Sequence, residues 1–139
     1  MAGDYSKYRR HYEDLSFDYD LATATGGPVT LLTARNAKYQ IYIQKISIDV
    51  GTYSAKVLTF ADSAGTPVEI ASSSIPGTEP TNAGAQNYEH DFGSEGTALT
   101  VGKNLVLTLS GAGVAARIHV ACFQRLASTG FIGDTAANQ

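Results

Sequence analysis

The middle of the chain alternates hydrophobic and polar residues with a period of two, most clearly over residues 104–124. In the first run of this stretch, Leu105, Leu107 and Leu109 share one face. In the second run, the residues that share one face are Val114, Ala116, Ile118, Val120 and Cys122. Such alternation over five or more residues is typical of a strand with one buried face. Because glycine adopts a positive φ without a steric clash, the Gly-Ala-Gly break at 111–113 predicts a tight turn, and the two runs are predicted to form a β-hairpin.

Residues 28–126 consist almost entirely of predicted strands and turns. We expect eight strands, near residues 28–34, 38–50, 54–61, 67–72, 86–92, 97–101, 104–110 and 114–125. In the second of these, the hydrophobic set changes face part-way along, from Tyr39, Ile41 and Ile43 to Ile46, Ile48 and Val50. One extra residue near Gln44–Lys45 explains the change, and it predicts a β-bulge or a bend between sheets.

Short strands about 8–12 residues apart, with no helical period among them, are typical of a β-sandwich or barrel. We therefore predict an all-β fold: an antiparallel, jelly-roll-like β-sandwich of about eight strands, with an extended or short-helical N-terminal arm and a C-terminal tail. The predicted units are a docking arm over residues 1–25, the sandwich domain over 26–126 and the tail over 127–139. The long connection at 73–85 contains two prolines and two glycines, and we expect a functional or mobile loop there.

The N-terminal arm has its own pattern. Tyr5, Tyr8, Tyr12 and Leu15 have the spacing of one helical stripe, which Asp4 could cap. After them, Phe17, Tyr19 and Leu21 alternate as in an extended strand. The arm either packs on its own sandwich or is a tether that binds a partner, and the abundance of tyrosine and arginine at interface hot spots favours the tether. The candidate partner-binding residues are Tyr5, Tyr8, Arg9, Arg10, Tyr12, Leu15, Phe17 and Tyr19.

Composition narrows the class of protein. The 139 residues are enough for one domain with its own core, only 17% of them are charged, and the net charge is −3. Nucleic-acid binding needs a concentrated basic field, so we expect no nucleic-acid partner. No window approaches the ~20 apolar residues of a membrane span, and the charged N-terminus lacks the apolar run of a signal peptide. We therefore expect no membrane partner and synthesis in the cytoplasm. Cys122 is the single cysteine, so an internal disulfide is excluded.

The residue types needed for catalysis or metal binding do not occur at the required spacings. His11, His90 and His119 form no His-x-His or His-x-x-x-His pair, and no Gly-x-Ser-x-Gly elbow occurs. Arg117, His119 and Arg125 are predicted to share one face of the last strand, where either an anion site or a solvated face is possible. We expect no enzyme activity, no cofactor and no metal.

Three stretches carry a resemblance: PVTLLTARNAKYQIYIQKISIDV, SAKVLTFADSAGTPVEIAS and NLVLTLSGAGVAARIHVACFQRL. Over about residues 28–126 the chain resembles small jelly-roll structural proteins of tailed bacteriophages. The resemblance implies a virion component, and more narrowly a capsid decoration or cement protein on the outer capsid surface. Such a protein would bind the major capsid protein, stabilise contacts between capsomers and form a homotrimer. Two alternatives remain: a receptor- or glycan-binding head or other small tail or fibre part, and, more distantly, a cupin-like ligand binder or sandwich enzyme.

Overall fold

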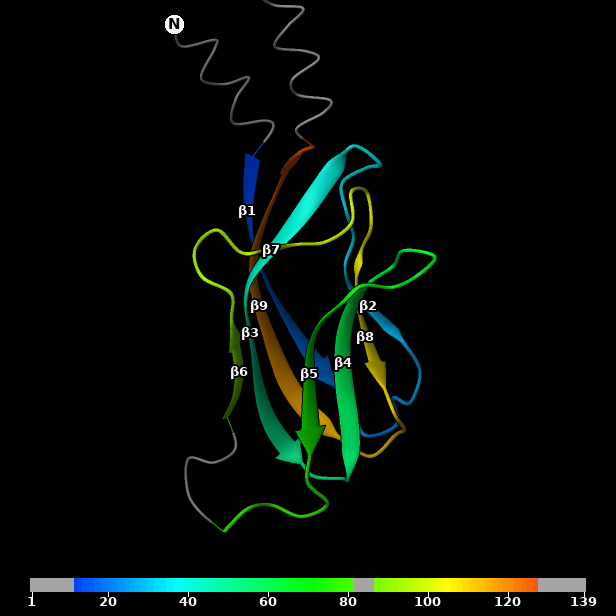
Figure 1. Ribbon diagram of the computed structural model, residues 1–139. Helices are drawn as coiled ribbons and strands as arrows, with labels where there is room; N and C mark the ends of the chain where they lie inside the picture. Colours follow the sequence, from blue (N-terminus) through cyan, green and yellow to red (C-terminus); the bar gives the residue numbers. More distant parts are fainter. Residues whose placement is uncertain (1–11, 82–86, 128–139) are drawn as a thin grey trace, which may run out of the picture.

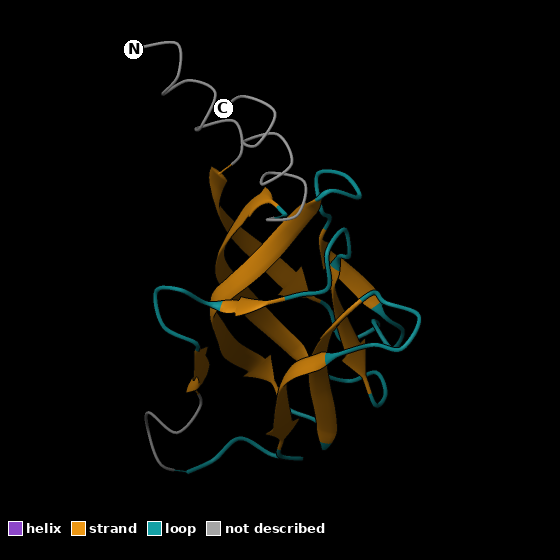
Figure 2. Ribbon diagram, turned by 45° about the horizontal axis from the view of Figure 1, so that its top comes forward, coloured by secondary structure: helices purple, strands orange, loops and turns teal. Residues whose placement is uncertain are grey.

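The computed structural model describes residues 12–81 and 87–127, which form nine strands in two facing antiparallel sheets (Figures 1 and 2). No helix occurs among these residues. The all-β sandwich predicted from the alternation is therefore confirmed.

Sheet A has the strand order β1-β9-β3-β6, with the short β7 also pairing with β3. Its strands are β1 (Tyr12–Leu21), β3 (Tyr39–Thr52), β6 (Asn87–Asp91), β7 (Thr97–Ala98) and β9 (Ala115–Leu126). Sheet B has the order β2-β8-β4-β5 and contains β2 (Val29–Leu32), β4 (Lys56–Asp62), β5 (Glu69–Ile75) and β8 (Leu105–Leu109). With β7 set aside, four strands face four, and the chain crosses repeatedly between the sheets, as in a jelly roll.

The predicted strands correspond to β2–β9, with ends that differ by a few residues. The predicted β-bulge is confirmed, because the register of β3 against β9 shifts between Ile43 and Lys45. The loop predicted at 73–85 starts later than expected, because β5 continues to Ile75. Ser73 and Ile75, at the end of this strand, are buried. The alternation of β5 continues through this serine-rich stretch, which the prediction treated as loop.

The predicted hairpin at 104–124 is wrong. β8 pairs with β2 and β4 in sheet B, whereas β9 pairs with β1 and β3 in sheet A. The connection between them crosses from one sheet to the other, and its backbone bonds other segments: Ser110 N donates to Val57 O (3.0 Å) and Gly113 N to Thr23 O (2.9 Å). Gly113 does adopt a positive φ, of 127°.

The helical stripe is wrong from Tyr12 onward. Residues 12–21 form β1, which pairs with β9 at ten successive positions from Tyr12–Arg125 to Leu21–Ala116. The hydrophobic residues of β1 occupy alternate positions facing sheet B, so the strand interpretation given for Phe17, Tyr19 and Leu21 extends back to Leu15. The described part of the predicted arm is therefore an edge strand of the sandwich, and residues 1–11 lie outside the described part.

The core lies between the two sheets and is aliphatic. Its fully buried side chains are Phe60, Ile41, Ile43, Ile46, Ile48, Leu58, Leu99, Leu105, Leu107, Ile118, Val114 and Val120. Cys122 points into this core, as its place in the alternation predicted, and burial raises the pKa of its thiol to about 12. A thiol in this environment behaves as a small hydrophobic group.

One buried carboxylate joins the loops at one end of the sandwich. Asp62, only 2% exposed, ends β4 and accepts hydrogen bonds from the backbone N–H groups of Val68 (3.0 Å) and Thr100 (3.0 Å). It also accepts bonds from the Thr100 hydroxyl (2.5 Å) and from Ala64 N (3.2 Å). A single side chain thus fixes the β4–β5 turn against the segment that precedes β8.

Replacing Gly102 with alanine should destabilise the fold by about 1–3 kcal/mol. Gly102 has a φ of +75°, and a Cβ there would lie 2.7 Å from the carbonyl oxygen of Ala37. Gly65→Ala is the matched control, because a Cβ at Gly65 meets no atom within 4 Å and its φ is not in the left-handed region. Urea unfolding of the two variants measures the difference. Equal midpoints would show that the 36–38 segment can move away at little cost.

Candidate interaction surface

The predicted partner-binding residues fall into two groups. Tyr5, Tyr8, Arg9 and Arg10 lie outside the described residues, and Tyr12 is the first residue of β1. Leu15, Phe17 and Tyr19 are half-buried and pack against the core, and the Phe17 and Tyr19 rings stack 6.5 Å apart. These last three side chains anchor β1 to the sandwich, and their exposed parts lie along the β1 edge of sheet A.

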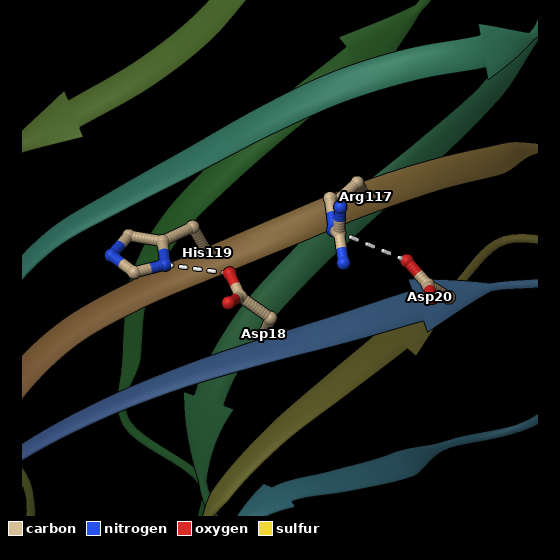
Figure 3. A network of polar contacts seen from close by, with 4 residues as sticks. All are labelled: Asp18, Asp20, Arg117 and His119. Atoms are coloured by element: carbon tan, nitrogen blue, oxygen red, sulfur yellow. Dashed lines mark hydrogen bonds and ion pairs between the residues drawn. The ribbon is translucent and has the colours of Figure 1, made fainter.

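The outer face of sheet A is charged, and its charges pair across neighbouring strands. Figure 3 shows two pairs between β1 and β9: Asp18 Oδ1 lies 2.6 Å from His119 Nδ1, and Asp20 Oδ1 lies 3.4 Å from Arg117 Nε. In both pairs the two residues are directly opposite in the register. Arg117, His119 and Arg125 share the exposed face of β9, as predicted, but Arg117 and His119 face carboxylates of the chain itself.

A further pair joins β3 to β6, where Lys45 Nζ lies 2.5 Å from Glu89 Oε1. This hydrogen bond and the nearby negative charge raise the pKa of Lys45. Exposed pairs of this kind contribute little to stability. Their placement along an edge strand instead discourages unwanted strand pairing, because an edge lined with charge is a poor template for another chain.

The outer face of sheet B is different, because it consists of small uncharged residues. Cross-strand neighbours on this face form rows such as Thr108–Thr59–Ser72 and Thr30–Val106–Ala61. The single charge in these rows is Glu69, at the end of the second one. Val57 on the same face is 37% exposed. The two outer faces of the sandwich therefore have contrasting chemistry: sheet A is charged and sheet B is close to neutral.

Each histidine that the structure describes has a side-chain partner within the chain, and this partner accounts for its position. His90 Nε2 lies 2.7 Å from Ser73 Oγ, and this hydrogen bond joins β6, an edge of sheet A, to β5, an edge of sheet B. His119 pairs with Asp18, and His11 is outside the described residues.

Within 12–81 and 87–127, no group of three or more His, Cys, Asp or Glu residues is placed to hold a metal ion. The same part of the chain has no helix long and apolar enough to span a membrane.

An aromatic cluster that the sequence did not single out lies on β3 and β9, near the end of sheet A where β1 begins and β9 ends. The rings of Tyr42 and Phe123 stack with centroids 4.9 Å apart and an interplanar angle of 7°. The Arg125 guanidinium lies 4.6 Å from the centre of the Tyr42 ring, and its Nη2 donates a hydrogen bond to the Tyr42 hydroxyl (3.1 Å). Tyr12 is directly opposite Arg125 in the register, so the cluster adjoins the start of β1.

Comparison with known proteins identifies the fold and no sequence family: no family model and no curated protein matches the sequence. A chain in the acid-stable capsid structure of Helicobacter pylori bacteriophage KHP30 superposes with a TM-score of 0.54 at 14% identity, covering 81% of this chain and 89% of that chain. The fold is shared with a phage capsid chain. Weaker similarities are to a virus-like particle of Macrobrachium rosenbergii extra small virus (TM-score 0.36, 12% identity, 81% and 77% covered) and to infectious bursal disease virus (0.26, 13%, 85% and 36%).

Proposed function

We propose that this chain is a structural component of a virus particle, a decoration or cement protein bound to the outside of a shell of major capsid protein. The observation that carries the proposal is the extent of the shared fold. The superposed fold covers 81% of this chain and 89% of the chain in the KHP30 capsid structure, so the likeness spans most of both chains. We infer that such a protein works by binding other proteins through its outer surface.

The proposed mechanism is burial of surface across the seams between capsomers. Residues 1–11 precede β1 in the sequence and contain two tyrosines and two arginines of the predicted docking set, and we assign one attachment to them. In a homotrimer three such attachments act together, so that weak single contacts give strong binding overall. A closed cyclic trimer also satisfies the usual symmetry of homo-oligomers. The protein would be made in the host cytoplasm and end in the virion.

Purified particles of the virus that encodes this chain test the proposal. We expect mass spectrometry to find the protein in a fixed ratio to the major capsid protein, and cryo-electron microscopy to place the sandwich on the outer surface of the head. Density on a tail fibre or spike would instead support the receptor- or glycan-binding alternative. Absence of the protein from particles would reject both assignments.

Replacing Tyr8 and Tyr12 together with alanine should weaken binding to shells by a few kcal/mol, about the effect of removing interface hot spots. Sedimentation of labelled protein with shells that lack it measures the affinity. The control is the double variant Val68→Ala and Val101→Ala, which removes two exposed hydrophobic side chains outside the predicted docking set. Equal binding by the two double variants would reject docking through the tyrosines.

A further inference from the structure

A cavity of about 450 Å³ opens on the outer face of sheet A next to the aromatic cluster. The residues that line it are Tyr42, Ser94, Glu95, Gly96, Phe123 and Arg125. They come from β3, β9 and the loop that joins β6 to β7, so the cavity forms where the strands that pair with this edge of β3 are interrupted.

The loop wall of this cavity is held in one position. Gly93 and Gly96 adopt φ values of 81° and 72°, and Gly96 N donates to Gly93 O (3.1 Å) to close the turn. Gln44 Nε2 donates to Ser94 O (2.7 Å), which attaches the loop to β3. A Cβ on Gly96 would lie 2.9 Å from Ile43 O, so the close approach requires glycine. A cavity fixed in advance loses less conformational entropy when it binds a ligand.

Two opposite charges at this cavity have no ionic partner in the described part of the chain. Among the side chains that the structure describes, Arg125 makes one hydrogen bond, to the Tyr42 hydroxyl, and pairs with no carboxylate. Glu95 is exposed and, within the same residues, makes no hydrogen bond or ion pair. This contrasts with Arg117, His119 and Lys45 on the same face, each of which faces a carboxylate.

We propose that this cavity receives an extended segment of the capsid-shell subunit, an inference that rests on the proposed function. An acidic residue of that segment binds Arg125, a basic residue faces Glu95, and an apolar side chain lies against the Tyr42–Phe123 pair. Arginine and tyrosine are the residue types enriched at interface hot spots, and fixed opposite charges give specificity of register.

The test measures affinity for shells assembled without this protein. We expect Arg125→Ala to raise the dissociation constant at least about tenfold and Glu95→Ala about threefold or more, as for charged hot-spot residues. Arg117→Ala and Glu89→Ala are the matched controls, on the same face but outside the cavity, and should stay within about twofold. The double variant Glu95→Arg and Arg125→Glu keeps the net charge of the protein. It should nevertheless bind shells as weakly as the single variants, because each charge then faces a like charge of the bound segment.

The outcomes separate the two proposals. If the unaltered protein does not bind shells, the proposed function fails. If the unaltered protein binds shells and the Arg125→Ala and Glu95→Ala variants bind them equally tightly, only the cavity inference fails. Because Arg125 stacks on Tyr42, the thermal stability of the Arg125→Ala variant is measured as well. Glu95→Ala removes a side chain that makes no hydrogen bond or ion pair among the described residues, so it reports on binding. A photo-crosslinker at Ser94 should capture a shell peptide with an acidic residue; capture of a second copy of this chain would overturn the assignment.

Discussion

Removal of residues 2–11 should leave a folded sandwich that no longer attaches to capsid shells, whereas removal of residues 2–20 should prevent folding. The second deletion takes away nearly all of β1, with its ten pairings to β9. It also removes Leu15, Phe17 and Tyr19 from one side of the core. Full burial of such a side chain contributes roughly 1.5–3 kcal/mol, and half-burial about half of that. Together with the lost β1–β9 hydrogen bonds, the loss approaches the whole stability of a typical domain, about 5–15 kcal/mol.

Circular dichroism and urea unfolding follow the folding of both truncated proteins, and co-sedimentation with shells follows attachment. Removal of residues 128–139 is the control, because it shortens the chain by a similar length at the other end. A cooperative, native-like transition after removal of 2–20 would show that β1 is dispensable. Full attachment after removal of 2–11 would reject the tether.

Asp62→Ala should destabilise the protein by about 3–5 kcal/mol, because it leaves several buried donors without an acceptor at about 1–3 kcal/mol each. Among these are Val68 N, Thr100 N and the Thr100 hydroxyl. Chemical unfolding measures the loss. Asp91→Ala is the matched control: Asp91 accepts a single exposed bond, from Gly93 N, so its loss should cost far less. Similar costs for the two variants would mean that the loops rearrange around position 62.

Because of the same carboxylate, the free energy of unfolding should fall at acidic pH. Burial alone raises the pKa of Asp62, but the hydrogen bonds from Thr100, Val68 and Ala64 outweigh it, so the pKa lies below the ordinary value of 3.8. The charged form is therefore favoured by folding. The contribution of Asp62 to stability is complete at any pH above its pKa in the unfolded protein. It is lost as the pH falls below that pKa and then through the lower pKa of the folded protein. Unfolding free energies from pH 6 to pH 2 should fall less steeply for Asp62→Asn; parallel curves would contradict this account.

The strands could be predicted because alternation is a local property, set by which face of each strand is buried. The bulge in β3 was visible for the same reason, since the hydrophobic set changes face there. The sheet to which a strand belongs is not a local property. Leu105 and Ile118 both face the core, yet they belong to opposite sheets, and the same pattern would suit a hairpin. β1 was missed up to Leu15 because its tyrosines also fit a helical spacing.

The candidate surface was predictable only in part. The exposed face of β9 follows from the alternation, and Arg117, His119 and Arg125 lie on it. The aromatic cluster could not be predicted, because it depends on the register that places Tyr42 opposite Phe123. The role of Asp62 was also hidden, since its partners at 68 and 100 are brought together only by the fold.

The solitary thiol gives this protein a built-in reporter. Cys122 is 1% exposed and lies on β9 between β1 and β3, so a thiol reagent reaches it only when sheet A opens. Under native conditions the rate of labelling therefore measures the free energy of that opening. Free protein and protein attached to a particle can be compared by this rate without any engineered tag, and slower labelling on the particle would measure how far attachment holds the sandwich closed.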